Sequence, residues 1–387
     1  MTDDGFTARL AGRAADIGIA AWNRCANPSG RPDPHPFTRY EFFAALEESK
    51  SAVPRTGWRP LHLVIERDGR IDGLMPLYVK RHSQGEYVFD HAWADALERA
   101  GGRYYPKLQA SVPFTPVTGR RMLIADSADE GTTRYALLGA GAAAVEHLDC
   151  SSLHITFATE DECRAAEAMG YLLRTDRQFH WENRGYDSFD AFLTDLSSSK
   201  RKNLRKERAA IQAEGIAFDW LTGSDITEAH WDAFFEFYMD TGGRKWGHPY
   251  LTREFFSRIG QDMADQILLI LARRGEKYIA GALNLFGEGV LYGRNWGCTE
   301  YVPFLHFEAC YYQAIDFAIA KGLAKVEAGA QGEHKLLRGY NPVPTYSAHF
   351  IAHPGLRVAV ANYLKAEREA IAEDIEDLAA ASPFKKA

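Results

Sequence analysis

The sequence has few cysteines, and none of them has the spacing of a disulfide framework or a zinc site. Five cysteines are scattered over 387 residues without a CxxC pair. We therefore expect a reducing, cytoplasmic compartment. Long apolar runs are missing too, since nowhere do roughly 18 apolar residues occur together, and the N-terminus begins acidic. We expect neither a signal peptide nor a membrane span, and peripheral membrane contact stays open.

Four common catalytic signatures are also missing. The chain contains no P-loop, no GxGxxG after a strand, no GxSxG and no HExxH. The sequence therefore contains no motif that supports phosphotransfer, hydride transfer, serine hydrolysis or zinc proteolysis. The sequence predicts no metal site and no tightly bound cofactor.

Positive charge is scarce overall but concentrated in one place. The formal net charge is -7, which disfavours DNA binding and a large nucleic-acid footprint. Residues 197–211, SSSKRKNLRKERAAI, nevertheless place six Lys or Arg in nine positions. This run is compatible with a solvated helix face, a nucleic-acid contact or a site for a phosphate-bearing substrate. At helical spacing Leu204, Arg208 and Ile211 share one side, and the candidates for phosphate binding are Lys200, Lys202 and Lys206.

The length suits two domains of mixed α/β type. A proline-rich segment at 27–36 ends a first helix, and residues 38–49 predict a second. Two β-rich runs around an RDG turn predict a hairpin at 61–80, followed by a strand at 85–90.

The second half repeats the order of motifs found in the first. RIDGLMPLY at 70–78 aligns with YIAGALNLF at 278–286, and a Val-Pro-Phe follows each hairpin, at 112–114 and 302–304. Each is followed by a helix and then a short strand, which indicates a tandem duplication. We predict an N-terminal helix and entry segment (1–36), a first unit (37–185), a second unit (186–354) that carries catalysis, and a C-terminal helix and tail (355–387).

Residues 326–346, VEAGAQGEHKLLRGYNPVPTY, form the strongest candidate site, because ionisable residues are dense there. The alternative is a solvated loop in which the glycines assist a chain reversal. We hypothesise that Glu327 or His334 assists deprotonation of an attacking amine. The other candidates, which would hold anionic groups, bind substrate or donate a proton, are Gln331, Lys335, Arg338 and Tyr340.

Two neighbouring segments add candidates for substrate binding. A strand leads into a helix that begins near Phe304, and a helix start favours phosphate or carboxylate. The segment 241–256 predicts a loop rich in aromatic and basic residues, suited to an acceptor. The first segment contributes Arg294, Trp296, His306 and Glu308, and the second contributes Lys245, Trp246 and His248.

With these features together, the chain resembles the FemAB-like N-acyltransferases of the GNAT superfamily. The resemblance covers nearly all of the chain from FTRYEFFAALEE to NPVPTYSAHFI, and GEYVFDHAWADALERAGGRYYPKL, RKWGHPYLTREFF and PFLHFEACYYQAIDFAIAKGLAKVEAGAQGEHKLLRGY are its most specific stretches. It implies an α/β (α+β) fold of two tandem GNAT-like units, each a mixed sheet flanked by helices, plus a C-terminal helix.

The resemblance also implies transfer of an acyl group from a carrier to an amine. Other GNAT proteins grip acyl-CoA with a glycine-rich loop, and this sequence departs from that loop with CTEYVPFLHFEA at 298–309. Our first interpretation is an acyl-CoA or acyl-carrier donor, with a small or lipid-like amine of the sphingoid kind as acceptor. The second is a Fem-type enzyme that moves an aminoacyl group from tRNA to a cell-wall or peptide amine, and the third is a binding module without catalysis.

Overall fold

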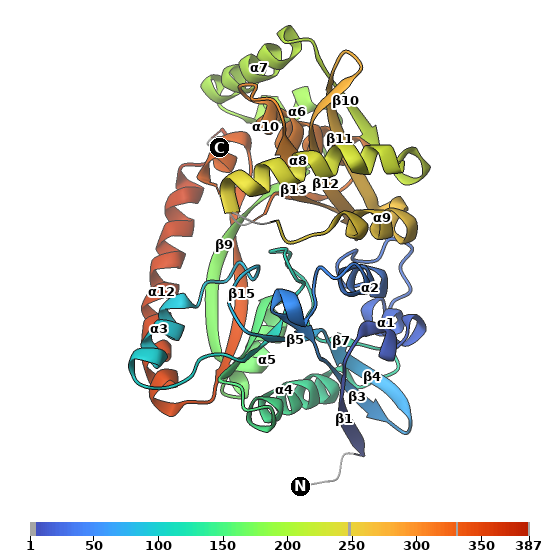
Figure 1. Cartoon of the computed structure of the whole chain (residues 1–387). Coiled ribbons are helices and arrows are strands. Elements are labelled where there is room, and N and C mark those ends of the chain that lie inside the picture. The colour runs from blue at the N-terminus through green and yellow to red at the C-terminus, as the bar shows by residue number, and fades with distance from the viewer. Residues whose placement is uncertain (1–4, 247–248, 330–331, 386–387) are drawn as a thin grey trace. The chain divides into compact units, whose positions relative to one another are not determined.

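The computed structural model describes residues 5–246, 249–329 and 332–385, and the chain forms two units (Figure 1). Unit 1 consists of residues 1–176 and 344–373, and unit 2 consists of residues 177–343 and 374–387. The chain passes between the units inside β9 (Leu172–Glu182), β15 (Asn341–Ile351) and α12 (Pro354–Ala380). The predicted boundary between residues 185 and 186 thus lies just beyond β9. Of the predicted C-terminal segment, residues 355–373 belong to unit 1.

Unit 1 contains two sets of paired strands. One has the order β1-β3-β4-β7, and the other has the order β15-β8-β6-β5-β2, in which the β6–β8 pair is parallel. The elements are β1 (Phe6–Ala11), α1 (Ile19–Ala26), α2 (Tyr40–Glu48), β2 (Trp58–Pro60), β3 (His62–Arg67), β4 (Arg70–Met75), β5 (Leu77–Lys80), α3 (His91–Arg99), β6 (Lys107–Ala110), β7 (Leu123–Ile124), α4 (Glu130–His147), β8 (Ser152–Ala158) and α5 (Glu160–Ala168).

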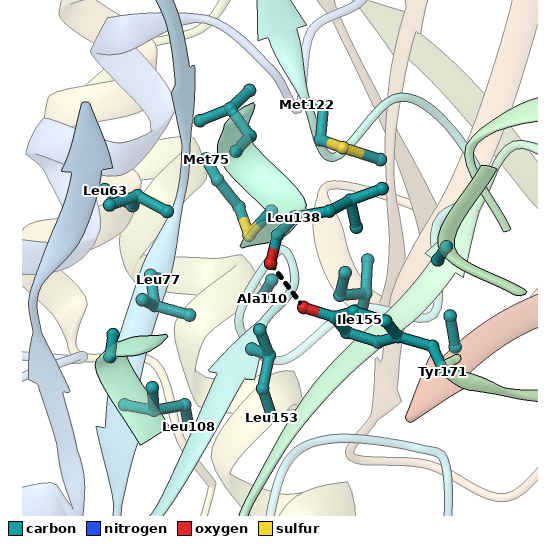
Figure 2. Close-up of a cluster of buried hydrophobic side chains, with 14 of the residues drawn as sticks. Leu63, Met75, Leu77, Leu108, Ala110, Met122, Leu138, Leu153, Ile155 and Tyr171 are labelled. Carbon is teal, nitrogen blue, oxygen red and sulfur yellow. Dashed lines mark hydrogen bonds between the residues drawn. The ribbon is translucent and has the colours of Figure 1, made fainter. Parts of the chain in front are cut away.

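One side of the unit 1 strands packs on α4 and forms the apolar core shown in Figure 2. Alternate residues of β6 and β8, such as Leu108 and Leu153, are fully buried there. The Tyr171 hydroxyl donates to the Leu138 carbonyl at 2.7 Å, which satisfies the one polar atom that this ring brings into the core (Figure 2). Each fully buried leucine contributes roughly 1.5–3 kcal/mol.

The other side of the same strands is polar, and it explains why the strand predicted at 85–90 does not form. The carboxylates of that segment turn inward instead: Glu86 accepts from the Lys107 Nζ at 2.7 Å, and Asp90 accepts from the same amine. Lys80 lies 3.5 Å from Glu86. We call Lys80, Glu86, Asp90 and Lys107 the buried ion cluster, since all four are almost inaccessible to solvent. Compensation of buried charge therefore overrode the β-rich pattern.

Unit 2 is built on strands in the order β10-β11-β12-β13-β14-β9, with β13 and β14 parallel. The hairpin that repeats that of the first half and the helix after the second Val-Pro-Phe are both present. The remaining elements are α6 (Phe189–Asp195), α7 (Ser198–Ala213), β10 (Ile216–Leu221), α8 (Glu228–Trp246), α9 (Arg253–Asp262), β11 (Ile267–Arg274), β12 (Lys277–Gly287), β13 (Val290–Cys298), α10 (Leu305–Phe307), the π-helical turn Glu308–Tyr312, α11 (Gln313–Ala320), β14 (Lys325–Glu327) and the 3-10 helix Glu333–Arg338.

In both halves of the chain, two helices precede antiparallel strands, which are followed by a helix, a strand that pairs in parallel and a last strand. The last strand of each half completes the other unit. β9 pairs with β14 in unit 2, and β15 pairs with β8 in unit 1. Neither unit is therefore a continuous piece of the sequence. The duplication that the sequence predicts is present. The exchange of the last strands between the two halves was not predicted from the sequence.

The loop predicted at 241–256 begins later than expected, because α8 continues through residues 241–246. Trp231, Phe234 and Phe237 bury one side of this helix. A Cβ at Gly242 would approach a Pro249 carbon to 2.5 Å, so glycine permits the chain to return closely there. Tertiary packing thus outweighs the helix cost of two adjacent glycines, roughly 1 kcal/mol each. Within the described ranges, no helix has the length and apolarity needed to cross a bilayer.

Candidate active site

The candidate site begins where two parallel strands of unit 2 separate. β13 pairs with β14 only from Val290 to Tyr292, after which β14 ends and β13 continues. The β12–β13 register shifts between Leu283 and Asn284, which redirects the side chains that follow. A small cavity of about 80 Å³ opens there. Its polar lining consists of Asn284, Arg294, Asn295, Trp296, His306, Cys310 and Tyr311.

A larger, mainly apolar groove of about 650 Å³ lies beside this cavity and shares two residues with it, Trp296 and His306. Their rings are in edge contact with centroids 5.4 Å apart. The groove follows the segment that leads into α10, and Tyr301 stands 88% exposed at it. The other groove residues are Thr241, Cys298, Glu300, Val302, Pro303, Phe304, Leu305 and Phe307.

The helix beside both cavities is irregular. Its first turn, α10, passes into a π-helical turn from Glu308 to Tyr312 before α11 resumes. Such turns insert one residue into a helix and often occur at functional sites. Glu308, predicted to bind substrate, is buried and accepts from Arg208 at 2.9 Å and from Gln313 at 2.8 Å. Its burial raises the pKa of its carboxyl group, which the Arg208 charge opposes.

The basic helix α7 holds this turn with two inward-facing residues. Arg208 also donates to Asp316 at 2.7 Å, and Glu207 accepts from Arg338 at 2.9 Å and from the Tyr312 hydroxyl. The Arg338 guanidinium lies 3.5 Å from the centre of the Phe307 ring. Arg338, predicted to bind substrate, therefore braces α7 against α10 and is itself buried.

Glu327, predicted as a base, lies at the end of β14 beside the cations Lys325 and Arg294 and the imidazole of His180, whose pKa burial lowers to about 4. It accepts from Lys325 at 2.9 Å, and Arg294 and His180 lie 3.6 and 3.9 Å from its carboxylate oxygens. Burial alone would raise the pKa of Glu327, but His180, Lys325 and Arg294 together lower it to about 2. A carboxylate this weakly basic orients Arg294 better than it accepts a proton.

Three further predicted site residues of the segment 326–346 have different environments. His334 is exposed, and its Nε2 lies 2.9 Å from the Tyr311 hydroxyl. Lys335 is buried and donates to the Gly329 carbonyl at 2.8 Å; burial, with the Arg294 charge, lowers its pKa to about 7. Tyr340 is fully buried, its hydroxyl 3.4 Å from the Tyr311 carbonyl, and burial raises its pKa.

The three predicted phosphate ligands do not line either cavity, and two of the predicted acceptor residues lie in a helix. Lys202 and Lys206 are exposed on α7, and Lys200 is half-buried on the same helix. Leu204 and Ile211 are buried, as the helical spacing predicted. Lys245 and Trp246 belong to the last turn of α8. His248 and Gln331 lie outside the described residues.

Sequence reasoning offered no role for several residues of the small cavity, among them Asn284, Cys310 and Tyr311. Asn284 sits in a β-rich run, and Cys310 and Tyr311 lie in a helix whose regular period hides the π-helical turn. Only the local irregularities in β12–β13 and in the helix bring these residues together with Arg294 and His306. In the described ranges, no group of three or more His, Cys, Asp or Glu residues could hold a metal ion.

A family model described as peptidoglycan biosynthesis/recognition matches residues 13–386 of the chain. Solved structures with a similar fold include FemX, at 12% identity and a TM-score of 0.54, covering 88% of this chain and 98% of that one. L-PGS from Bacillus licheniformis has 12% identity and a TM-score of 0.52, with 86% and 98% covered. A conserved protein of unknown function from Bacteroides thetaiotaomicron has 10% identity and a TM-score of 0.50, with 89% and 100% covered. No curated protein matches the sequence.

Proposed function

Because the chain belongs to the FemAB-like family of acyl- and aminoacyl-transferases, we propose that it is an N-acyltransferase acting on a lipid-like amine. Its fold is the predicted one, with two tandem GNAT-like units, and its enzyme class is that of an acyltransferase. In the proposed reaction, the amine nitrogen attacks the carbonyl carbon of an acyl thioester, with acyl-CoA as the favoured donor. The new C–N bond forms, the C–S bond breaks, and the thiolate leaves with the proton that the amine loses. The products are an amide and free CoA.

One observation carries the proposal: the apolar groove and the small polar cavity share Trp296 and His306. An alkyl chain requires an apolar channel, and the reacting carbonyl requires polar groups at its end. The groove supplies exposed apolar surface at Tyr301 and Phe304. This pairing favours a substrate with a long apolar part over a compact polar one.

The residues of the small cavity suit the developing charges. The amide groups of Asn284 and Asn295 and the Arg294 guanidinium line it, and such donors stabilise a carbonyl oxygen that becomes negative. In our proposal Glu327, 3.6 Å from the Arg294 guanidinium, keeps that group oriented.

Two imidazoles are available for the amine proton. His306 lines both cavities, and its ring centroid lies 6.2 Å from that of His334. We assign proton acceptance to His306, and we assign to His334, which is hydrogen-bonded to Tyr311, the role of a neighbouring acid or base. Lys335, whose pKa of about 7 leaves much of it neutral near neutral pH, is a further proton carrier beside this site.

The test incubates purified protein with acyl-CoA species of several chain lengths and with a panel of short- and long-chain amines. Free thiol is followed together with the mass of the amide. We expect turnover with long-chain amines, and we expect His306→Ala to lower kcat by about 10²–10⁴. His91→Ala, at an exposed histidine of unit 1, is the matched control. Full activity of His306→Ala would remove this residue from the mechanism.

The exposed amines of Lys202 and Lys206 favour a second candidate donor, aminoacyl-tRNA. Neither lysine makes an ion pair with another described residue, so both are available to phosphates. Charged tRNA joins the same assay, with deacylation as its readout. Consumption of tRNA that is lost in a Lys202→Glu/Lys206→Glu variant and at high salt would favour this donor. If neither donor is consumed across the panel, both proposed reactions are wrong.

A further inference from the structure

Unit 1 contains a pocket that the proposed reaction does not use. Its volume is about 460 Å³, and its lining combines two arginines with an apolar floor. We call it the arginine pocket. It is lined by Pro54, Gly57, Arg59, Val79, Arg81, Tyr105, Pro106, Leu148 and Cys150.

Arg59 lines the pocket from β2, and Arg81 lines it from the position directly after the end of β5. Arg59 pairs with Val79 across the β2–β5 ladder, and Arg81 follows Val79 by two residues. Because both arginines line the same pocket as Val79, both guanidiniums can reach a ligand that rests on Val79. Trp58 and Lys80 pair with each other in the same ladder and point to its opposite side. There the Lys80 amine lies 3.6 Å from the centre of the Trp58 ring.

The charge of these arginines is not compensated by the protein. Over the described ranges, neither Arg59 nor Arg81 makes a hydrogen bond or an ion pair with another side chain, and no acidic residue lines the pocket. Most arginines of this acidic chain are bonded to carboxylates or carbonyls, as Arg103 is to the neighbouring Asp149. The Arg59 charge reaches the pocket floor, where it opposes the burial that raises the pKa of Cys150 to about 11.

The walls of the pocket are held in place from behind. The Tyr105 hydroxyl lies 2.8 Å from the Ser83 Oγ, which accepts from Lys107 of the buried ion cluster at 2.8 Å. On the other side, Gly57 has a φ of +76°, and a Cβ there would overlap the His82 ring. The pocket is therefore preformed, which lowers the entropic cost of binding.

From the uncompensated arginines, the apolar floor and the fixed walls, we infer that the arginine pocket binds a small organic phosphate monoester. Paired guanidiniums match phosphate oxygens in geometry and charge. The volume exceeds what inorganic phosphate fills, and Val79, Leu148 and Pro106 would contact the organic part of the ester.

Isothermal titration calorimetry of the full chain with phenyl phosphate and with inorganic phosphate tests this inference. We expect phenyl phosphate to bind at least about tenfold more tightly, because its ring covers the apolar floor, and we expect binding to weaken as salt rises. Arg59→Gln/Arg81→Gln should lower the affinity for phenyl phosphate by tenfold or more. Arg99→Gln, at an exposed arginine of α3 in the same unit, should leave it unchanged.

Three results would overturn the inference: no binding of phenyl phosphate at millimolar concentration, equal affinities for the two probes, or unchanged binding in the double variant. Thermal unfolding of each variant ensures that a loss of binding is not a loss of fold. Without binding, the arginines would serve only to keep β2, the edge strand, from pairing with other chains. No acyl donor is present in these titrations, so their outcome does not depend on the proposed reaction.

Discussion

The two units place the same arrangement of strands in different surroundings. In each, a parallel pair is completed by an antiparallel strand from the other half of the sequence: β6–β8 with β15, and β13–β14 with β9. The central strand carries a buried polar residue that faces a histidine. In unit 1 His154 faces His349, and in unit 2 Glu327 faces His180.

What differs is how the polar side is completed. In unit 1 the buried ion cluster balances two lysines with two carboxylates. In unit 2 the strands separate, the helix takes a π-helical turn, and two cavities open beside Trp296 and His306. The polar side of a duplicated framework can thus be filled by internal ion pairs in one copy and open onto cavities in the other. This contrast is why we assign the chemistry to unit 2.

The buried ion cluster of unit 1 depends most on Lys107, which contacts both of its carboxylates. Lys107→Met leaves Glu86 and Asp90 buried without their shared cation, so we expect a loss of about 3–5 kcal/mol in the free energy of unfolding. Urea denaturation measures it. Lys202→Met, at an exposed lysine of α7, should change the stability by about 0.5 kcal/mol or less. Equal effects of the two substitutions would mean that the ion cluster contributes nothing specific.

The ion pairs of Arg208 in unit 2 should contribute less to stability than the buried ion cluster of unit 1, because Arg208 is partly exposed. Arg208→Met removes its bonds to Glu308 and Asp316, and we expect a loss of about 1.5–3 kcal/mol in stability together with lower acyl transfer. A double-mutant cycle with Glu308→Gln separates the pairwise term. Additive effects of the two substitutions would show that Arg208 does not hold the π-helical turn through Glu308.

Each unit contains one buried lysine, Lys80 or Lys335, whose pKa burial lowers from 10.5 to about 7. Above pH 7 the unfolded chain keeps a proton that each lysine has released in the folded chain, so these two sites make the free energy of unfolding rise with pH. The slope is at most about 1.4 kcal/mol per pH unit for each lysine. Urea denaturation between about pH 7 and 8.5 should show a smaller slope in Lys80→Met and in Lys335→Met than in the parent. Identical slopes would contradict the lowered pKa values.

The smallest change in stability is expected at the groove of unit 2. Tyr301 is 88% exposed, so Tyr301→Ala should change the free energy of unfolding by about 0.5 kcal/mol or less. Its loss should nevertheless raise KM for long-chain amines several-fold, and leave KM for short ones unchanged, because only the long chains would cover the ring. A uniform change across chain lengths would place the alkyl chain outside this groove.

Much of the fold was predictable, because its signals are local. The hairpins, the helix after each Val-Pro-Phe and the buried side of α7 follow from periodicity and turn residues. The strand predicted at 85–90 does not form, and the loop predicted at 241–256 was wrong over residues 241–246, which belong to α8. In both segments distant contacts decided the conformation: Lys107 drew the carboxylates of the first inward, and packing extended α8 in the second.

The candidate site was predictable only in part. Dense ionisable residues drew attention to 326–346, and the end of β13 and the helix start contributed Arg294, Trp296 and His306, which do line the cavities. Sequence density could not separate Glu327, held among cations, from exposed His334 or fully buried Tyr340. The environment of Glu327 depends on β9, and that of Arg338 depends on α7; both elements lie more than a hundred residues away along the chain.

The sequence by itself determined that this chain is a duplicated α/β protein, where its helices and hairpins lie, and which side of α7 is buried, because local periodicity encodes these features. Only the tertiary structure decided that the last strand of each half completes the other unit, that unit 1 closes over its charges, and that unit 2 opens beside His306. The physical reason is that burial and strand register depend on residues far apart in the chain, and these set whether a polar side chain meets a counter-charge or a cavity.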